Sequence, residues 1–213
     1  MGRPATGSEG INISYDYQQE NYFTYRKKPK GHNITAILGN QIQKWDFQTT
    51  DLKAQAFSSD NIETFNNVAT FDLAGTNTGR SGHSLIGLFS SASYDYKGKY
   101  LISGTLRRDG SSRFGVDKRY GYFPSGSIGW RISSENFMKG ASSVVDNLLI
   151  KASYGTNGNE RIGDYNSLLL YSPKAYYNGI NTITITQLSN PNLDGRAHNH
   201  LILGSMVHFE RSF

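Results

Sequence analysis

The fold is decided by residues 100–115, which read YLISGTLRRDGSSRFG. Apolar or small residues alternate with polar ones over the first half of this stretch: Tyr100, Ile102, Gly104 and Leu106 against Ser103, Thr105 and Arg107. A period of two places successive side chains on opposite faces of an extended strand. The stretch therefore predicts a strand with one apolar and one polar face. The charged and small residues that follow mark the point where the chain leaves the sheet.

The same alternation recurs along the chain, at 11–17, 34–42, 86–96, 122–132 and 148–154. We expect strands of about nine to fourteen residues, near the nine to eleven that a tilted strand needs to cross a bilayer. Strands of soluble domains average nearer five or six residues. Helical periodicity is nearly absent. The sequence contains no apolar run of about 18 residues, so a membrane-spanning helix is not expected. The pattern favours an all-β, antiparallel, up-and-down transmembrane β-barrel segment, a partial barrel of about six to eight strands.

The predicted connections alternate between short and long. Residues 26–31 and 97–99 are short polar turns, whereas 46–83 and 156–193 are predicted as long external loops and 107–120 as an intermediate one. Short turns at one end and long loops at the other are typical of outer-membrane barrels.

Composition is compatible with this class. The chain has 213 residues, 37% hydrophobic residues, 14 Tyr, 11 Phe and no Cys. A β-sheet that contacts lipid on one face only has a low mean hydropathy, because apolar residues occupy only every second position. The absence of Cys argues against a disulfide scaffold or a thiol nucleophile. The net charge of +5 is scattered, so nucleic acid is not an expected partner.

Aromatic residues gather near the predicted strand ends. Such rings suit the aromatic girdles at the two membrane surfaces, although aromatics are also enriched in ordinary strands. The residues concerned are Tyr15, Tyr17, Tyr94, Tyr96, Tyr100, Tyr122, Phe123, Trp130 and Tyr154.

Four blocks in fixed order resemble a known family, over residues from about 10 to 193. They are 100–115, 120–138 with YGYFPS and IGWRIS, 147–165 with NLLIKASYGTNGN and IGDY, and 188–193 with LSNPNL. Together they resemble the SusC/RagA-type TonB-dependent outer-membrane transporters, in the C-terminal barrel region. The motif residues, all expected to be structural, are Arg107, Arg108, Asp109, Gly110, Ser111, Ser112, Arg113, Phe114, Gly121, Tyr122, Phe123, Pro124, Ser125, Trp130, Arg131, Ser153, Tyr154, Gly155, Asn157, Gly158, Asn159, Asn190 and Pro191.

The resemblance implies a large barrel with a plug domain, located in the cell outer membrane and energised by TonB. It implies nutrient uptake of oligosaccharides or peptides with a SusD-like lipoprotein, with no cofactor and no enzymatic activity. This chain would supply barrel wall and external loops, and its polar face would line the lumen through Ser103, Thr105, Arg107, Ser127, Arg131, Lys151 and Ser153.

Local chemistry suggests structural roles. Arg107, Arg108, Asp109 and Arg113 are expected to pair with each other around a Gly110–Ser112 turn, each exposed pair contributing about 0–1 kcal/mol. A contact of Arg113 with an anionic ligand or lipid headgroup is the functional alternative. Pro124 is expected near a strand start, Trp130 at the periplasmic interface, and residues 155–159 where a strand ends.

Enzymatic and metal chemistry find little support. Asp109 with Asp117, or Asp164 with Glu160, could form a carboxylate pair for glycoside hydrolysis, but no spacing rule selects them. His198 and His200 lack a supporting carboxylate or Cys, so a metal site is not expected.

The two ends depart from the family pattern. Residues 1–7 lack the apolar core of a signal peptide, and 194–213 are predicted to be a divergent tail, truncated or out of frame, after a barrel region at 1–193. Alone, such a sheet is expected to aggregate or to need detergent. The alternatives are a soluble β-sandwich that binds glycans and a surface adhesin barrel without transport.

Overall fold

The computed structural model describes residues 5–59, 61, 64–141, 145–177 and 180–208. Its strands are β1 (Thr6–Lys27), β2 (His32–Phe57), β3 (Val68–Phe71), β4 (Asn77–Tyr96), β5 (Tyr100–Ser111), β6 (Tyr120–Arg131), β7 (Asn147–Asn159), β8 (Leu170–Tyr177), β9 (Ile180–Gln187) and β10 (Arg196–His208). Short 3-10 turns lie at Phe65–Asn67, Val116–Lys118, Ile132–Ser134 and Asn136–Ala141. The expected all-β fold is confirmed.

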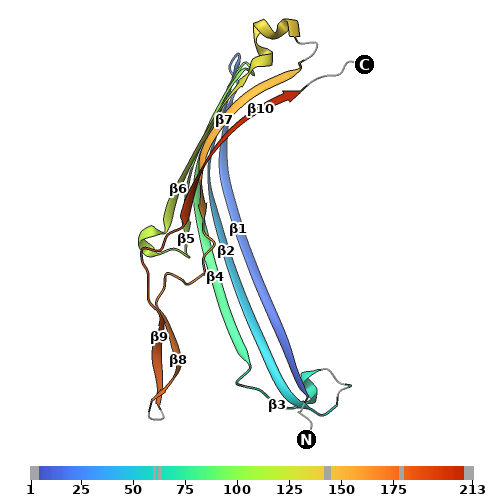
Figure 1. The fold of residues 1–213 in the computed structure, drawn as a ribbon, viewed down its shortest axis with the longest axis vertical. Coiled ribbons are helices and arrows are strands. Elements are labelled where there is room, and N and C mark those ends of the chain that lie inside the picture. Colours follow the sequence, from blue (N-terminus) through green and yellow to red (C-terminus); the bar gives the residue numbers. More distant parts are fainter. Residues whose placement is uncertain (1–4, 60, 62–63, 142–144, 178–179, 209–213) are drawn as a thin grey trace. The chain divides into compact units, whose positions relative to one another are not determined.

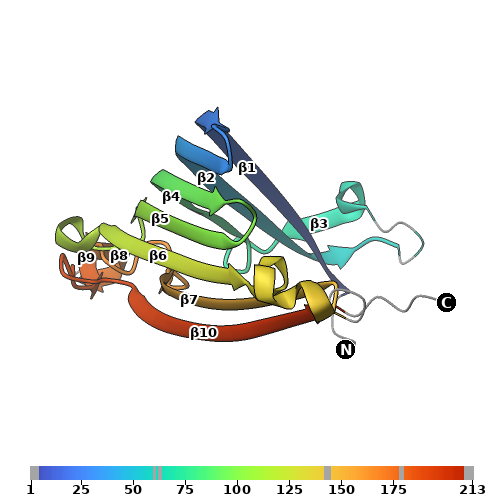
Figure 2. The same cartoon turned by 90° about the horizontal axis from the view of Figure 1, so that it is seen from above.

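Eight strands form one sheet in the order β1-β2-β4-β5-β6-β7-β10, with β3 paired to β2 (Figure 2). The path is open, and β8 with β9 makes a separate two-stranded sheet. The chain divides into two compact units: residues 1–17 with 43–83, and residues 18–42 with 84–213. None of the helical segments in the described ranges is long and apolar enough to span a membrane.

The larger unit, 18–42 with 84–213, contains the stretch that decided the fold. Cross-strand register aligns Ser93 of β4, Ser103 of β5, Ser127 of β6 and Ser153 of β7 in one row. The neighbouring row contains Tyr94, Ile102, Ile128 and Ala152. Because side chains alternate between faces, one face of these strands is polar and the other apolar. The predicted alternation is thus confirmed across four strands.

The apolar face has no packed layer over it in the described part of the chain. Ile128 is 62% exposed, Ile102 53% and Leu106 49%, and among the described residues the one buried hydrophobic side chain is that of Ala54. A soluble domain of this size would bury a core between two layers. These residues instead present a broad apolar surface outward.

The turn between β4 and β5 follows from local geometry. Lys97 and Gly98 both have positive φ, 53° and 69°, and the amide of Lys99 donates to the carbonyl of Tyr96 at 2.9 Å. Two successive positive φ angles define the tight hairpin turn whose twist matches its strands. The predicted turn at 97–99 is confirmed, and the turn predicted at 26–31 is confined to 28–31 because β1 continues through Lys27.

The smaller unit, 1–17 with 43–83, is organised around aromatic contacts. Trp45 and Phe47 stack with ring centres 5.6 Å apart, and His83 packs at 5.2 Å from Trp45. The ring of Phe65 lies 6.2 Å from that of Phe57 and 6.1 Å from that of Phe71. These contacts hold the ends of β2 and β4 and the short strand β3.

Several predicted loops were wrong in extent. The loop expected at 46–83 contains the end of β2, all of β3 and the start of β4, because hydroxyl-rich and amide-rich residues also form strands when both neighbours pair. The loop expected at 156–193 contains the end of β7 and the β8–β9 hairpin. Strand lengths of 12, 12 and 13 residues for β5, β6 and β7 are as predicted, but β1, β2 and β4 reach 22, 26 and 20.

Residues 155–159 are the last five residues of β7, which ends at Asn159, within the segment predicted for the strand end. They pair with 196–200 of β10 up to that point, so the polar, Gly-rich sequence is held by its neighbour. The predicted Gly110–Ser112 turn is wrong, since β5 continues through Ser111. Arg196–His208, in the predicted divergent tail, forms β10; the domain boundary at 193 stays a prediction.

Pro124 lies inside β6 and not at its start. It pairs with Leu106 of β5, whereas the ladder between β6 and β7 ends at Ser125 and Gly155. A proline lacks the amide hydrogen that a ladder needs. Its position just past the end of the β6–β7 ladder explains how the strand accommodates it.

Candidate functional site: the loop junction and the flanking faces

Three sequence-distant segments meet where β5, β6 and β7 end, and we call residues 111–119, 160–168 and 187–193 the loop junction. Gly115 donates its amide to the carbonyl of Leu193 at 2.8 Å, and Asp117 donates to Pro191 at 3.2 Å. Asn190 in turn donates to the carbonyl of Ser167 at 3.0 Å. Parts of three of the four motif blocks, 100–115, 147–165 and 188–193, therefore lie close together in space.

Gly115 is where two of these segments approach most closely. A Cβ atom on this residue would lie 2.0 Å from the carbonyl oxygen of Pro191 and 2.8 Å from that of Asn190. No side chain fits at that distance, so the close backbone approach requires glycine. In the sequence, Gly115 is the last residue of the 100–115 motif, and no local signal indicates this role.

Arg113 and Asp164 form the ion pair of the loop junction. Arg113 Nε donates to Asp164 Oδ1 at 2.8 Å, and the two side chains are 18% and 11% exposed. Arg113 Nη1 also donates to the carbonyl of Glu160 at 3.4 Å. A largely buried pair of this kind fixes loop geometry, because losing either partner leaves an uncompensated charge. The structural role predicted for Arg113 agrees with this geometry, although its partner is Asp164 and not a residue of its own motif.

Two serines attach the 111–119 segment to its neighbours. Ser112 accepts on Oγ from the amide of Ser84 at 2.9 Å and donates its own amide to the carbonyl of Ser84 at 3.0 Å. Ser111 is almost fully buried, and its Oγ accepts from the amide of Arg113 at 3.3 Å. The two hydroxyls satisfy backbone donors that a turn would otherwise leave unpaired.

The β8–β9 hairpin is closed at its base by one side chain. Gln187 Nε2 donates to the carbonyls of Tyr165 and Leu168, each at 2.8 Å. Beyond this clamp the hairpin stands apart from the ends of β5 and β6 (Figure 1). The alternation of Thr and Ile over 182–186 places Ile183 and Ile185 on one face, with Ile183 72% exposed.

Arg107 organises the polar face near the loop junction. Its Nη2 lies 3.1 Å from Asp109 Oδ1 and donates to Gln41 Oε1 at 3.2 Å, while its guanidinium lies 5.3 Å from the ring of Phe89. The predicted pairing within the motif is confirmed for Arg107 and Asp109. Phe123, predicted for an aromatic girdle, alternates onto this polar face, where its ring contacts the Gly121 and Gly158 positions.

Arg108 points to the opposite, apolar face. Its guanidinium carbon lies 4.2 Å from the ring centre of Tyr120 and 5.9 Å from that of Tyr122. The ring of Tyr120 in turn covers Gly110, where a Cβ atom would lie 2.5 Å from it. Arg108 therefore takes part in no ion pair with its own motif, contrary to the prediction.

A second polar cluster lies at the other end of the strands, around Glu135. Lys99 Nζ donates to Glu135 Oε2 at 2.8 Å, and Tyr100 Oη and Trp130 Nε1 donate to Oε1 at 2.7 and 3.2 Å. These donors, Lys99 foremost, lower the pKa of Glu135 from 4.5 to about 2. Trp130 was predicted at an interface, whereas Glu135 was not predicted, since its only sequence signal is its position five residues after Trp130.

Most other residues with a predicted position lie on the face of the sheet that their alternation in the sequence indicates. The seven residues expected on the polar face share one face of β5, β6 and β7. The β7 residues Ser153, Gly155 and Asn157 alternate along that face, while Tyr154 lies on the apolar face in mid-strand and not near a strand end as predicted. Arg131 donates to the carbonyl of Gly98 at 3.0 Å.

In each carboxylate pair considered for catalysis, one carboxylate forms an ion pair with an arginine. Asp109 is paired with Arg107 and Asp164 with Arg113. Within the part of the chain that the structure describes, no three His, Cys, Asp or Glu side chains gather as a metal site would need.

Several known proteins are similar to this chain. The TonB-dependent receptor P39 of Formosa agariphila is 46% identical over 188 residues, 88% of this chain and 18% of that protein. The TonB-dependent receptor SusC of Bacteroides thetaiotaomicron is 40% identical over 82 residues, 38% of this chain and 8% of that protein. The structure of the RagAB peptide transporter aligns over 96% of this chain and 22% of its own, with a TM-score of 0.81 and 22% identity.

The resemblance to SusC/RagA-type TonB-dependent receptors is confirmed. No family model matches the chain. The chain spans about a fifth of the length of the receptors it matches over most of its own length, at 18% of P39 and 19% of the TonB-dependent receptor P3 of Formosa agariphila. The loop junction and the two-faced sheet are thus features of a chain that is similar to one part of a TonB-dependent receptor.

Proposed function

We propose that the chain forms part of the barrel wall of an outer-membrane transporter that imports nutrients. The observation that carries this proposal is the continuous sheet with one exposed apolar face and one polar face. A sheet of this kind is stable only where lipid covers one side. The relatives, all TonB-dependent receptors, support the same role.

The apolar face is proposed to meet lipid and the polar face the lumen. Aromatic residues occur toward both ends of the apolar face: Tyr96, Tyr100 and Trp130 near the short turn, and Tyr120 and Tyr122 near the loop junction. Girdles of this type mark the two membrane surfaces of outer-membrane barrels. The short turn is then periplasmic and the loop junction external.

Cargo and partners follow from the relatives' names and stay proposals. SusC and the RagAB peptide transporter support oligosaccharides or peptides as cargo, a SusD-like lipoprotein as surface partner and TonB as energy source. In this proposal Arg107, Ser103 and Lys151 face the lumen or the plug. The chain's role is mechanical, and no residue is assigned a catalytic step.

Single-cysteine scanning of β6 tests the proposed faces, since the chain has no native Cys. Spin labels at Tyr122, Gly126 and Ile128 are expected to collide with lipid-soluble oxygen when the chain is reconstituted in bilayers. Labels at Phe123 and Ser127 are expected to collide with a water-soluble nickel chelate instead. Accessibility without a period of two would contradict the barrel-wall proposal.

Neither alternative is favoured. A soluble glycan-binding β-sandwich needs a second sheet packed on the first, and among the described residues the only other sheet is the β8–β9 pair. An adhesin barrel would have the same wall, but all the curated relatives named above are receptors.

A further inference from the structure

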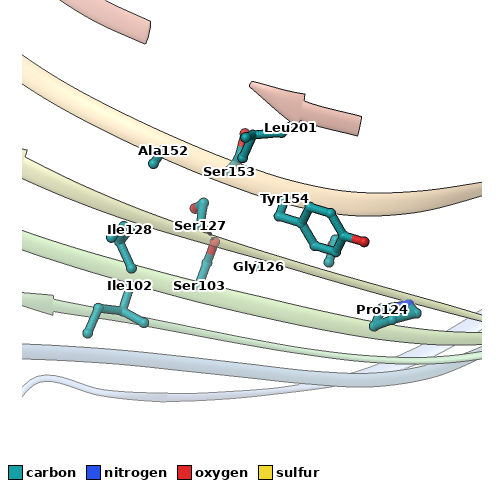
Figure 3. A pocket seen from close by; sticks show the side chains of 11 residues that line it. Ile102, Ser103, Pro124, Gly126, Ser127, Ile128, Ala152, Ser153, Tyr154 and Leu201 are labelled. Carbon is teal, nitrogen blue, oxygen red and sulfur yellow. Dashed lines mark hydrogen bonds between the residues drawn. The ribbon is translucent and has the colours of Figure 1, made fainter. Parts of the chain in front are cut away.

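The apolar face carries an open depression of about 520 Å³ between β5, β6, β7 and β10. Its floor is Gly126, with Ile102 and Ile128 on one side, Pro124 on the other, and Tyr154 and Leu201 at the end. Figure 3 shows the isoleucines and Tyr154 extending from one side of the sheet and the serines from the other. The depression therefore belongs to the apolar face.

Glycine creates this depression. Gly126 pairs with Gly104 across β5 and β6, so two adjacent positions lack side chains between two rows of large ones. A Cβ atom on Gly126 would approach only the carbonyl of Ser103, at 3.6 Å, and one on Gly104 only that of Ser125, at 3.8 Å. No close packing demands glycine at either position. The missing side chains leave a space on the apolar face that no residue of this sheet fills and that a ligand can occupy.

A cation lies at the outer end of the same face. Arg108 is exposed and stacked on Tyr120, and in the described ranges no carboxylate pairs with it, whereas Arg107 and Arg113 each have an acidic partner. The row of Arg108 and Tyr122 lies four residues from the row of Gly104 and Gly126. At about 3.4 Å per residue that separation is about 14 Å, close to the roughly 15 Å thickness of one hydrocarbon leaflet.

We propose that this surface is a binding site for an anionic membrane lipid, whose phosphate meets Arg108 and whose acyl chain lies in the depression over Gly126. Charge complementarity selects the headgroup, because an unpaired guanidinium beside apolar surface is satisfied best by a phosphate. The apolar lining selects a hydrocarbon chain. The inference rests on the proposed function, since only a lipid-facing wall would meet such a ligand.

The test is lipid binding to the full chain, delipidated in neutral detergent, by native mass spectrometry. The probes are dipalmitoyl phosphatidylglycerol, dipalmitoyl glycerol and inorganic phosphate. We expect phosphatidylglycerol to bind tighter than either of the others. Arg108→Gln should weaken it about tenfold, the effect of one charge-assisted hydrogen bond. Gly126→Leu should weaken it similarly by filling the depression.

Arg119→Gln is the matched control, because it removes a cation from the exposed loop at 112–119 and should leave the affinity unchanged. Equal binding of phosphatidylglycerol to wild type and Arg108→Gln would overturn the proposal. So would phosphate binding as well as the lipid, or Gly126→Leu having no effect. Circular dichroism in the same detergent separates the two levels: loss of β-structure contradicts the barrel wall as well, whereas an intact sheet that does not bind lipid contradicts this site alone.

Discussion

Arg113 Nε lies 2.8 Å from Asp164 Oδ1, although 51 positions separate the two residues. The pair joins the loop after β5 to the segment that follows β7. The ion pair acts together with the backbone hydrogen bonds of the loop junction and with the hydrogen bonds that the Gln187 side chain donates.

Arg113→Ala is expected to loosen the loop junction without unfolding the sheet. The substitution leaves a largely buried Asp164 charge, which costs about 1–3 kcal/mol. Amide hydrogen exchange at 160–168 should accelerate about tenfold or more, while exchange in β5 and β6 stays unchanged. Lys118→Ala, an exposed loop position, should change neither. Unaltered exchange at 160–168 would show that the pair contributes nothing to loop order.

Gly115→Ala is expected to be more disruptive than its single methyl group suggests. The new Cβ atom would lie 2.0 Å from the carbonyl of Pro191, so the backbone must move. We expect a loss of about 2 kcal/mol or more, in the range of strained or overpacked sites. Gly140→Ala is the matched control, because a Cβ atom there meets no heavy atom within 4 Å. Equal unfolding midpoints in urea for the two variants would refute this expectation.

Glu135 predicts an acid-dependent loss of stability. Its pKa is lowered in the folded chain from 4.5 to about 2, mainly by the hydrogen bond from Lys99. A depressed pKa stabilises the fold above pH 4.5, and that stabilisation is lost as the pH falls from about 4.5 to about 2. The unfolding midpoint, followed by Trp130 fluorescence in a Trp45→Phe background, should fall across that range. Glu135→Gln should flatten this part of the curve, and an unchanged slope would contradict the prediction.

The β8–β9 hairpin is expected to open far more readily than the main sheet. It has two strands and an exposed apolar face, and isolated hairpins are marginally stable in water. Amide exchange in 180–187 should be at least a hundredfold faster than in β6, which has a strand neighbour on each side. Comparable protection in both segments would show that another surface covers the hairpin.

The alternating faces could be predicted because they depend only on the two-residue period. Ile102, Ile128 and Ser127 fall on the faces that their sequence positions indicate. The bounds of the loops could not be predicted, since β2 and β4 extend into polar sequence. Whether such sequence forms a strand depends on the neighbouring strands with which it pairs and not on its hydrophobicity.

The side-chain contacts of the loop junction could not be predicted from the sequence either. Arg113 was expected to pair within its own motif, and nothing local indicates Asp164 as its partner. Arg108 differs from Arg107 only in parity, which puts one guanidinium on the apolar face and the other beside Asp109. Long-range pairing of this kind follows from the fold and not from local spacing.

The clamp made by Gln187 has a practical consequence. Because its side-chain amide bonds the carbonyls of Tyr165 and Leu168, the two ends of the β8–β9 excursion are fastened together independently of what lies between them. We therefore expect that a segment of another length or sequence can replace the residues between Leu168 and Gln187 while the β7–β10 register is kept. Variation at the surface is thereby uncoupled from the architecture that supports it.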